Sequence, residues 1–382
     1  MNSCWRVEAF LTTSSQSSGT TQASWLNSGA VMAAANPFVG QTLDGRFQLV
    51  DFIGSGAFSF VFDALDVTIG KHVAVKLLNP SRATDLVALA EFEMEGQLLD
   101  RLRSCENVIN YVGTWSSPLH VTLAGATVLL VARYHVLELA EGCLTDLLPG
   151  RDTLAWDTKL QLFRDALKGT HQMHRHRTMH RDIKCDNGLL VLATRDGHVV
   201  KLGDLGRSRA LEVPPRLTST QYEHGRGDPS FAPPEYIWSL GSDDEDSLRR
   251  ADLFLLGSLL YELGTGQGLT SVAFADEWLV SGAYKGGSRR EEYLRRVPYL
   301  RARLSPAIDL FASAVPTPIR ESAAALVTQL CDPEPAARER RFRVELRQPP
   351  LGLDWVFRRV DILLRMNRNA ARPATARRRM FR

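Results

Sequence analysis

The periodicity of the apolar residues changes near Gly142, and this change limits the folds that the chain can adopt. Before it, an alternating run at 47–53 is followed by further runs typical of strands at 60–62, 72–78, 108–112 and 127–139. One helical spacing, at 86–103, interrupts them. Beyond Gly142 the patterns are helical, at 156–176, 248–263 and 323–330. The sequence therefore predicts an α+β protein with a small β-rich part and a larger helical part.

The two ends of the chain differ in composition from this central part. Residues 1–44 are rich in serine, threonine, alanine and glycine without sustained periodicity, which indicates a disordered leader. After Pro350, apolar residues recur at helical spacing from Leu353 to Leu364, which predicts an amphipathic helix before an arginine-rich tail. We therefore expect a leader at 1–44, one domain at 45–346 with parts at 45–140 and 141–346, and an end segment at 347–382.

The basic charge is concentrated in the last part of the chain. The net charge is +3, but residues 338–382 hold fourteen arginines against four acidic residues, so the remainder is acidic. Such a tail could contact an acidic partner, an anionic membrane or nucleic acid, or it could simply be solvated. No regular interleaving of aromatic residues supports stacking on nucleic-acid bases, so among these partners an acidic one is favoured over nucleic acid.

The sequence shows neither a membrane span nor a secretion signal. No apolar run approaches the roughly 18–20 residues that cross a bilayer. The first residues do not follow the pattern of a signal peptide. We therefore expect a cytoplasmic protein without a transmembrane segment.

Two features of the β-rich part point to phosphate chemistry, although each has a simpler explanation. A glycine turn, Gly54-Ser55-Gly56, joins two expected strands, and glycines let a backbone approach a phosphate closely. Such turns also join strands that bind nothing. Lys76 ends the apolar run from Val73, where it is either an exposed edge residue or a cation that holds an anion. Glu95, on the following helix, could fix that cation.

The segment from His180 to Asn187 carries the strongest indication of function. Its sequence is His-Arg-Asp-Ile-Lys-Cys-Asp-Asn, and Asp204-Leu205-Gly206 follows after two short strand patterns. A carboxylate can orient a hydroxyl nucleophile, a nearby lysine can neutralise a phosphate, and asparagine and aspartate oxygens suit Mg²⁺. A polar loop of satisfied ion pairs would be the alternative, but it does not account for this order and spacing together with the upstream features.

With these motifs in this order, the chain resembles the eukaryotic-type (Hanks-type) protein kinases of the serine/threonine branch. The resemblance implies a bilobal protein kinase fold with a small β-rich N-lobe and a larger helical C-lobe, and ATP in the cleft between them. It implies Asp182 as the catalytic base, Lys184 at the γ-phosphate, and Asn187 and Asp204 as Mg²⁺ ligands. Lys76 would contact the α- and β-phosphates while pairing with Glu95.

The resemblance also assigns residues to ATP. Glu95 is preferred to Glu91 and Glu93 as the partner of Lys76 because the leucines that follow it then fall where the helix packs. The backbone of Glu138-Leu139-Ala140 would bind adenine, with Leu137 behind it. The residues that the resemblance assigns to ATP are Ile53, Gly54, Ser55, Gly56, Ala57, Phe58, Val61, Ala74, Lys76, Glu138, Ala140 and Leu189.

Some positions depart from the family pattern. Leu205 replaces the usual phenylalanine, and we expect it to keep that residue's packing. Glu235 ends a Pro-Pro-Glu segment and is expected to pair with Arg338 or Arg340. Asp228 stands where these kinases carry a threonine that bridges the catalytic aspartate and lysine. Its carboxylate could pair with Lys184, or it could repel Asp182 and impair the base.

The sequence leaves alternatives open on two further points, whether the loop is regulated by phosphorylation and whether the chain is an active enzyme. Arg181 precedes the catalytic aspartate, so the resemblance suggests that a phosphate on Thr218, Ser219 or Thr220 would order the loop. These could equally be exposed hydroxyls without a role. We expect an active enzyme that transfers the γ-phosphoryl group of Mg-ATP to serine or threonine hydroxyls of proteins. The rival interpretations are a pseudokinase scaffold and a small-molecule kinase of related fold.

Overall fold

The structure is a computed structural model, and it describes residues 37–56, 58–123, 126–193, 197–214, 228–339 and 352–371. The chain divides into two compact units. The sheet unit comprises the chain up to Asp146 together with 189–198 and 203–206. The helical unit comprises 147–188, 199–202 and the chain from Arg207 onward. The division into a β-rich and a helical part, expected from the sequence, is confirmed.

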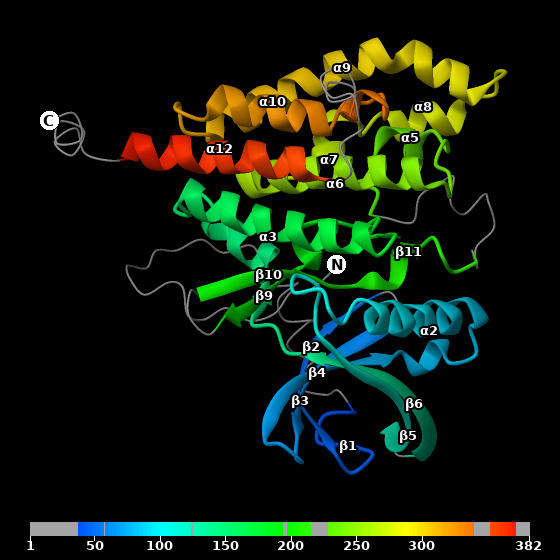
Figure 1. Cartoon of the computed structure of the whole chain (residues 1–382). Coiled ribbons are helices and arrows are strands. Elements are labelled where there is room, and N and C mark those ends of the chain that lie inside the picture. The colour runs from blue at the N-terminus through cyan, green and yellow to red at the C-terminus, as the bar shows by residue number, and fades with distance from the viewer. Residues whose placement is uncertain are drawn as a thin grey trace, which may run out of the picture. The chain divides into compact units, whose positions relative to one another are not determined.

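An antiparallel sheet of six strands forms the body of the sheet unit, in the order β1-β2-β3-β4-β6-β5 (Figure 1). Its strands are β1 Thr42–Leu43, β2 Phe47–Ser55, β3 Ser59–Asp66, β4 Lys71–Leu78, β5 Tyr111–Leu123 and β6 Ala126–Glu138. Aromatic and β-branched side chains fill one face, with Phe47, Phe62 and Tyr134 at its centre. The alternation of these residues along the strands explains why the face is apolar.

The sheet unit begins earlier than the sequence predicts. Phe38 and Leu43 are buried in its core, and Phe38 contacts the rings of Phe60 and Phe62. The end of the expected leader therefore belongs to the folded unit. Residues 1–36 lie outside the described residues.

Strand β5 also differs from the expected strand at 108–112. Val108 and Ile109 are buried but precede the strand, which continues from Tyr111 through Pro118 to Leu123. Proline is tolerated here because β5 is an edge strand of its sheet.

Helix α2, Leu86–Arg101, lies against the sheet, as Figure 1 shows. Asp85 begins it by accepting hydrogen bonds from the backbone of Val87 and Ala88. Farther along the sheet unit, β7, Gly142–Cys143, pairs with the strand β9, Gly188–Ala193, through Leu189 and Leu190.

The helical unit is built around α6, Glu245–Thr265, in which every residue from Ala251 to Thr265 is buried. Its two-stranded ribbon pairs β8 Thr178–Met179 with β11 Arg209–Ala210. The strand β10, Gly197–Leu202, is divided between the two units after His198. The helices are α3 Trp156–Arg175, α5 Pro234–Ile237, α6 Glu245–Thr265, α7 Leu269–Ala273, α8 Glu277–Ala283, α9 Arg289–Ala314, α10 Arg320–Leu330 and α12 Asp354–Ala371.

The amphipathic helix expected near the C-terminus is α12, and it packs on α3 within the helical unit (Figure 1). Arg164 pairs with Asp361 at 2.8 Å, and the Asn367 amide donates to Asp157 at 2.8 Å. The helix is thus part of this unit rather than a separate end segment. The arginine-rich residues 372–382 lie outside the described residues. Within the described part of the chain, no helix combines the length and apolarity needed to cross a membrane.

Candidate active site

The glycine turn closes a tight hairpin between β2 and β3. Gly54 lies opposite Val61 and Ser55 opposite Phe60, and the pairing register shifts between Phe52 and Gly54. The Gly56 N–H donates to the Ser59 carbonyl at 2.8 Å. Ala57, assigned to ATP by the resemblance, lies outside the described residues.

Lys76 is held by two carboxylates of the sheet unit. Its Nζ donates to both oxygens of Glu95, at 2.6 and 2.8 Å, and to Oδ1 of Asp204 at 3.1 Å. Lys76 comes from β4, Glu95 from α2, and Asp204 from the segment 203–206. The choice of Glu95 over Glu91 and Glu93 agrees with this geometry.

The charge of Lys76 is secured by its neighbours. Burial alone would lower the pKa of the ammonium group, but the carboxylates of Asp204 and Glu95 outweigh burial and raise the pKa above its usual value. The lysine therefore stays protonated, which a group that holds phosphates requires. The Asp204 side chain remains 54% exposed, so it can also reach a ligand. The backbone N–H of Leu205, a buried residue, donates to the Glu95 carboxylate.

Of the remaining ATP candidates of the sheet unit, Ile53, Val61, Ala74, Glu138 and Leu189 lie in strands, whereas Phe58 and Ala140 do not. Ala74 is buried on β4, opposite Leu137 of β6. The backbone of Asn110 makes two hydrogen bonds with Glu138. The Asn110 carbonyl accepts from the Glu138 N–H at 2.9 Å, and the Asn110 N–H donates to the Glu138 carboxylate at 2.6 Å. Leu189 packs against Gly203. A Cβ atom added at Gly203 would lie only 2.6 Å from Cδ1 of Leu189.

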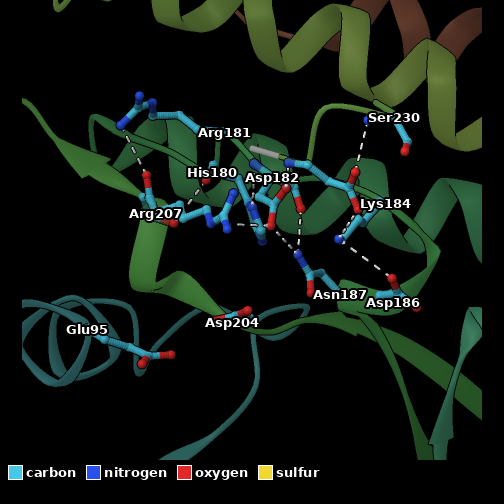
Figure 2. Close-up of polar contacts among 12 residues, drawn as sticks. Glu95, His180, Arg181, Asp182, Lys184, Asp186, Asn187, Asp204, Arg207 and Ser230 are labelled. Atoms are coloured by element: carbon cyan, nitrogen blue, oxygen red, sulfur yellow. Dashed lines mark hydrogen bonds and ion pairs between the residues drawn. The ribbon is translucent and has the colours of Figure 1, made fainter. Parts of the chain in front are cut away.

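In the helical unit, Asp182 is buried and oriented by its neighbours in the loop (Figure 2). The Asn187 amide donates to the Asp182 carbonyl at 2.7 Å and to its carboxylate at 3.1 Å. The Asp228 N–H donates to the other carboxylate oxygen at 3.3 Å. These donors hold the carboxylate in a defined direction, as a base must be held to meet a substrate hydroxyl.

Asp228 pairs with Lys184, the first of the two alternatives that the sequence left open. Its Oδ2 accepts from Lys184 Nζ at 3.1 Å, and its Oδ1 accepts from the Ser230 N–H at 2.9 Å. Burial works against the charged form of both groups, yet the pKa of Lys184 is raised by Asp182 and Asp228, and the pKa of Asp228 is lowered by Ser230 and Lys184. Both side chains are therefore charged, and the lysine already has an anionic neighbour.

Helix α6 supplies two carboxylates that support this loop. Asp252 accepts from the backbone N–H groups of His180 and Arg181, at 2.9 and 2.8 Å, and contacts His174 at 2.8 Å. One oxygen of Glu262 accepts from the Cys185 N–H at 3.0 Å. Glu262 was not identified from the sequence. A glutamate inside an apolar helical run does indicate a buried carboxyl group that needs a hydrogen-bond partner.

Arg207 is a second functional candidate that the sequence analysis missed. Its Nε lies 4.0 Å from Asp182 Oδ2, and its carbonyl accepts from the Arg181 guanidinium at 3.2 Å (Figure 2). Arg181 itself adopts a left-handed backbone conformation, with φ of 67°. Non-glycine residues adopt this conformation at a cost, and such residues cluster at functional sites.

The expected ion pair of Glu235 forms with Arg338. The guanidinium donates to both carboxylate oxygens, at 2.7 and 2.8 Å, and Arg338 is completely buried. Arg340 lies outside the described residues. The same holds for Thr218, Ser219 and Thr220, the expected phosphorylation sites.

Two of the described residues, one in each unit, offer oxygen atoms of the kind that a hard divalent cation binds. Because the Asn187 amide nitrogen donates to Asp182, its carbonyl oxygen is presented on the other side of the group. Asp204 offers a largely exposed carboxylate. Carbonyl and carboxylate oxygens are the ligands that Mg²⁺ prefers.

Comparison with known proteins agrees with this geometry. The protein kinase domain model matches residues 47–340. A probable serine/threonine-protein kinase PknB of Bifidobacterium longum is 30% identical over 224 residues, which is 58% of this chain and 30% of that protein. The serine/threonine-protein kinase PknL of Mycobacterium tuberculosis is 31% identical over 232 residues, 60% of this chain and 52% of that protein.

A similar segment also occurs within a larger eukaryotic protein. Human myosin-IIIa is 30% identical over 245 residues, 60% of this chain but 14% of the myosin. The chain thus spans no more than about half the length of these relatives. Since the domain match covers most of the sequence, the chain belongs to the protein kinase family.

Proposed function

We propose that the chain is an active ATP-dependent protein serine/threonine kinase. The observation that carries the proposal is the state of the loop at 180–187. Asp182 is buried, its carboxylate is oriented by Asn187, and Lys184 is charged beside it. The names of the bacterial relatives support serine and threonine as the acceptor residues.

The chemistry at the acceptor follows from Asp182. Its carboxylate accepts a hydrogen bond from the substrate hydroxyl, orients the oxygen toward the γ-phosphorus, and takes up the proton as the oxygen–phosphorus bond forms. The bond between the γ-phosphorus and the bridging oxygen breaks, and ADP leaves with that oxygen. Lys184 offsets negative charge on the transferring group, in competition with its pairing to Asp228.

Most of the residues that we assign to the nucleotide belong to the sheet unit, and Asn187 belongs to the helical unit. Lys76, kept protonated by Glu95 and Asp204, would hold the α- and β-phosphates. Asn187 and Asp204 would hold Mg²⁺, which supplies positive charge to the phosphates when bound. The hairpin at Gly54–Gly56 would cover the phosphates, and the strand residues Val61, Ala74 and Leu189 would contact the adenine.

One observation favours the rival pseudokinase interpretation. The Lys184–Asp228 pair places an extra carboxylate where the family's pattern has a neutral hydroxyl, and this lowers the positive charge available to the phosphate. An inactive scaffold would bind Mg-ATP and transfer nothing. We favour the active enzyme because Asp182 and Lys76 are both present and ordered.

The proposal is tested by identifying the amino acid that receives the phosphate. The purified chain is incubated with Mg-ATP labelled at the γ-phosphate and a generic basic protein, and the labelled protein is hydrolysed. We expect phosphoserine or phosphothreonine. Label that enters only small molecules would contradict the proposal in favour of a small-molecule kinase.

A further inference from the structure

The sheet unit contains a buried histidine that the proposed chemistry does not use. His135, on β6, is fully buried and lies in one row across the sheet with Lys76 of β4 and Thr114 of β5, its paired neighbours on either side. Its ring stacks on the ring of Phe92 in α2, with 3.8 Å between centroids and 9° between planes. The histidine therefore stands between the strand of Lys76 and the helix of Glu95.

A chain of hydrogen bonds passes through this ring. Its Nε2 lies 2.9 Å from the Phe92 carbonyl, and its Nδ1 lies 2.5 Å from the Thr114 hydroxyl. The Tyr111 hydroxyl lies 2.6 Å from that of Thr114. A carbonyl can only accept, so Nε2 carries a proton and donates to α2.

The protonation of His135 gives the remaining bonds a direction. Burial, together with the positive charge of Lys76, lowers the pKa of the histidine to about 3, so the ring is neutral. A neutral ring with its proton on Nε2 accepts at Nδ1. The Thr114 hydroxyl therefore donates to His135, which leaves its oxygen to accept from the hydroxyl of Tyr111.

Close packing at Gly96 also brings α2 against the His135 ring. Gly96 follows Glu95 directly, and a Cβ atom at Gly96 would lie 2.8 Å from the His135 ring and 3.0 Å from the Thr114 hydroxyl. The absence of a side chain at Gly96 lets the helix approach the histidine. Phe92, on which the ring stacks, and Gly96, where a side chain would collide with the ring, thus lie on either side of Glu95 along α2.

We propose that His135 is a positioning residue, which fastens α2 to the sheet and thereby holds Glu95 at Lys76. The inference rests on the proposed kinase function for its effect on rate, because the Glu95–Lys76 pair matters only if Lys76 holds phosphates. Its structural part, the attachment of α2, stands independently of that function.

Three variants separate the two hydrogen bonds of the ring. In His135→Gln, the amide nitrogen lies where Nε2 was and keeps the bond to the Phe92 carbonyl. In His135→Asn, the shorter amide lies where Nδ1 was and keeps only the contact with Thr114. In His135→Leu, neither bond remains. The comparison of Gln with Asn is matched, since both replace the ring by a neutral amide.

The test measures hydrogen exchange of the α2 amides and the kcat for phosphate transfer in all three full-length variants. We expect the α2 amides of His135→Asn and His135→Leu to exchange about three- to tenfold faster than those of the wild type, which corresponds to the free energy of one hydrogen bond. The amides of the β2–β3 hairpin should exchange as in the wild type. We expect kcat to fall by a similar factor in these two variants. His135→Gln should stay within about twofold of the wild type in both readouts.

Two results would overturn the inference. One is equal loss in all three variants, including His135→Gln, which would mean that only the bulk of the ring matters. The other is unchanged α2 exchange in His135→Leu. If the wild type itself transfers no phosphate, the kinase proposal fails, but the exchange measurement still decides whether His135 holds α2.

Discussion

The residue at position 228 determines how much negative charge Lys184 meets. Two carboxylates flank the ammonium group, Asp228 at 3.1 Å and Asp186 at 3.6 Å. At an effective dielectric constant near 20, a unit charge about 4 Å away contributes about 4 kcal/mol, so the presence of one carboxylate matters for the rate. Asp228 also gives its N–H to Asp182, a contact that any residue except proline can make at this position.

We therefore predict that Asp228→Thr raises the rate of phosphate transfer by about three- to tenfold, less than the full Coulomb energy implies because Asp228 is partly exposed and solvent screens its charge. The threonine hydroxyl can still bridge to Lys184 but no longer competes with the phosphate as an anion. Asp228→Asn is the matched control, because it removes the charge while keeping the shape, and it should show part of the gain. Steady-state kcat/KM with a protein substrate is the measurement. Unchanged or slower transfer by both variants would contradict this role of the carboxylate.

Glu262 provides a prediction for the dependence of stability on pH. Burial raises the pKa of its carboxyl group from its usual value of 4.5 to about 7, despite the hydrogen bond from Cys185. Between these values the folded protein binds a proton that the unfolded chain does not. The contribution of the Glu262 carboxyl group to the free energy of unfolding is therefore fully present below pH 4.5, and it is lost as the pH rises through 7.

The Glu262→Gln variant tests this directly, because glutamine keeps the shape and does not titrate. The free energy of unfolding of the wild type relative to the variant should fall by about 3 kcal/mol between pH 4.5 and pH 8. Urea unfolding of both proteins across this range measures the difference. A constant difference would show that Glu262 titrates normally in the folded state.

At single positions, the sequence predicted those residues whose order along the chain is distinctive. The pairing of Lys76 with Glu95 could be expected because each partner lies within a motif or within reach of one. For Glu235 the sequence left two candidate partners, Arg338 and Arg340, and the structure shows the pair with Arg338. Glu262 and Arg207 could not be expected, since their importance comes from a neighbour distant in sequence or from a loop geometry. His135 was also beyond reach, as a histidine within an apolar strand gives no indication of what covers it.

At the scale of helices and strands, proline caused the largest difference between expectation and structure. Helix α9 contains Pro298 and Pro306, which normally indicate a helix end, so no helix was predicted for this segment. Six buried residues recur at helical spacing along it, and their packing outweighs the two lost hydrogen bonds. These residues are Tyr293, Val297, Leu300, Leu304, Ala307 and Phe311.

The ion pair between Glu235 and Arg338 joins two segments of the helical unit, α5 and the chain after α10. Because both groups are buried, we predict that Arg338→Met lowers the free energy of unfolding by about 3–5 kcal/mol, through the unpaired carboxylate that it leaves. Adding Glu235→Gln should restore part of this loss. Denaturant unfolding of the single and double variants measures both effects.

An exposed pair in the same unit serves as the control. Arg303 and Asp276 are 3.4 Å apart, with side chains 44% and 74% exposed. Arg303→Met should therefore cost less than about 1 kcal/mol. A comparable loss in the two arginine variants would mean that burial does not set the value of the Glu235–Arg338 pair.

At the scale of the whole molecule, the sequence and the structure agree on a β-rich part and a helical part. The sheet unit holds a protonated lysine between two carboxylates, and the helical unit holds an oriented aspartate beside a second lysine. The change in apolar periodicity near Gly142 was enough to predict this division. The segments expected to carry regulation and to contact partners, at 218–220 and 372–382, remain expectations from the sequence alone.

The central claim is that Asp182 makes this chain an active kinase, and one measurement tests it most directly. The initial rate of γ-phosphate transfer from Mg-ATP to a protein substrate is compared between the wild type and Asp182→Asn, with ATP affinity measured in parallel. We predict that the variant transfers phosphate at least about 100-fold more slowly while binding ATP as well as the wild type does. A folded wild type that binds Mg-ATP but transfers no more phosphate than the variant would contradict the account.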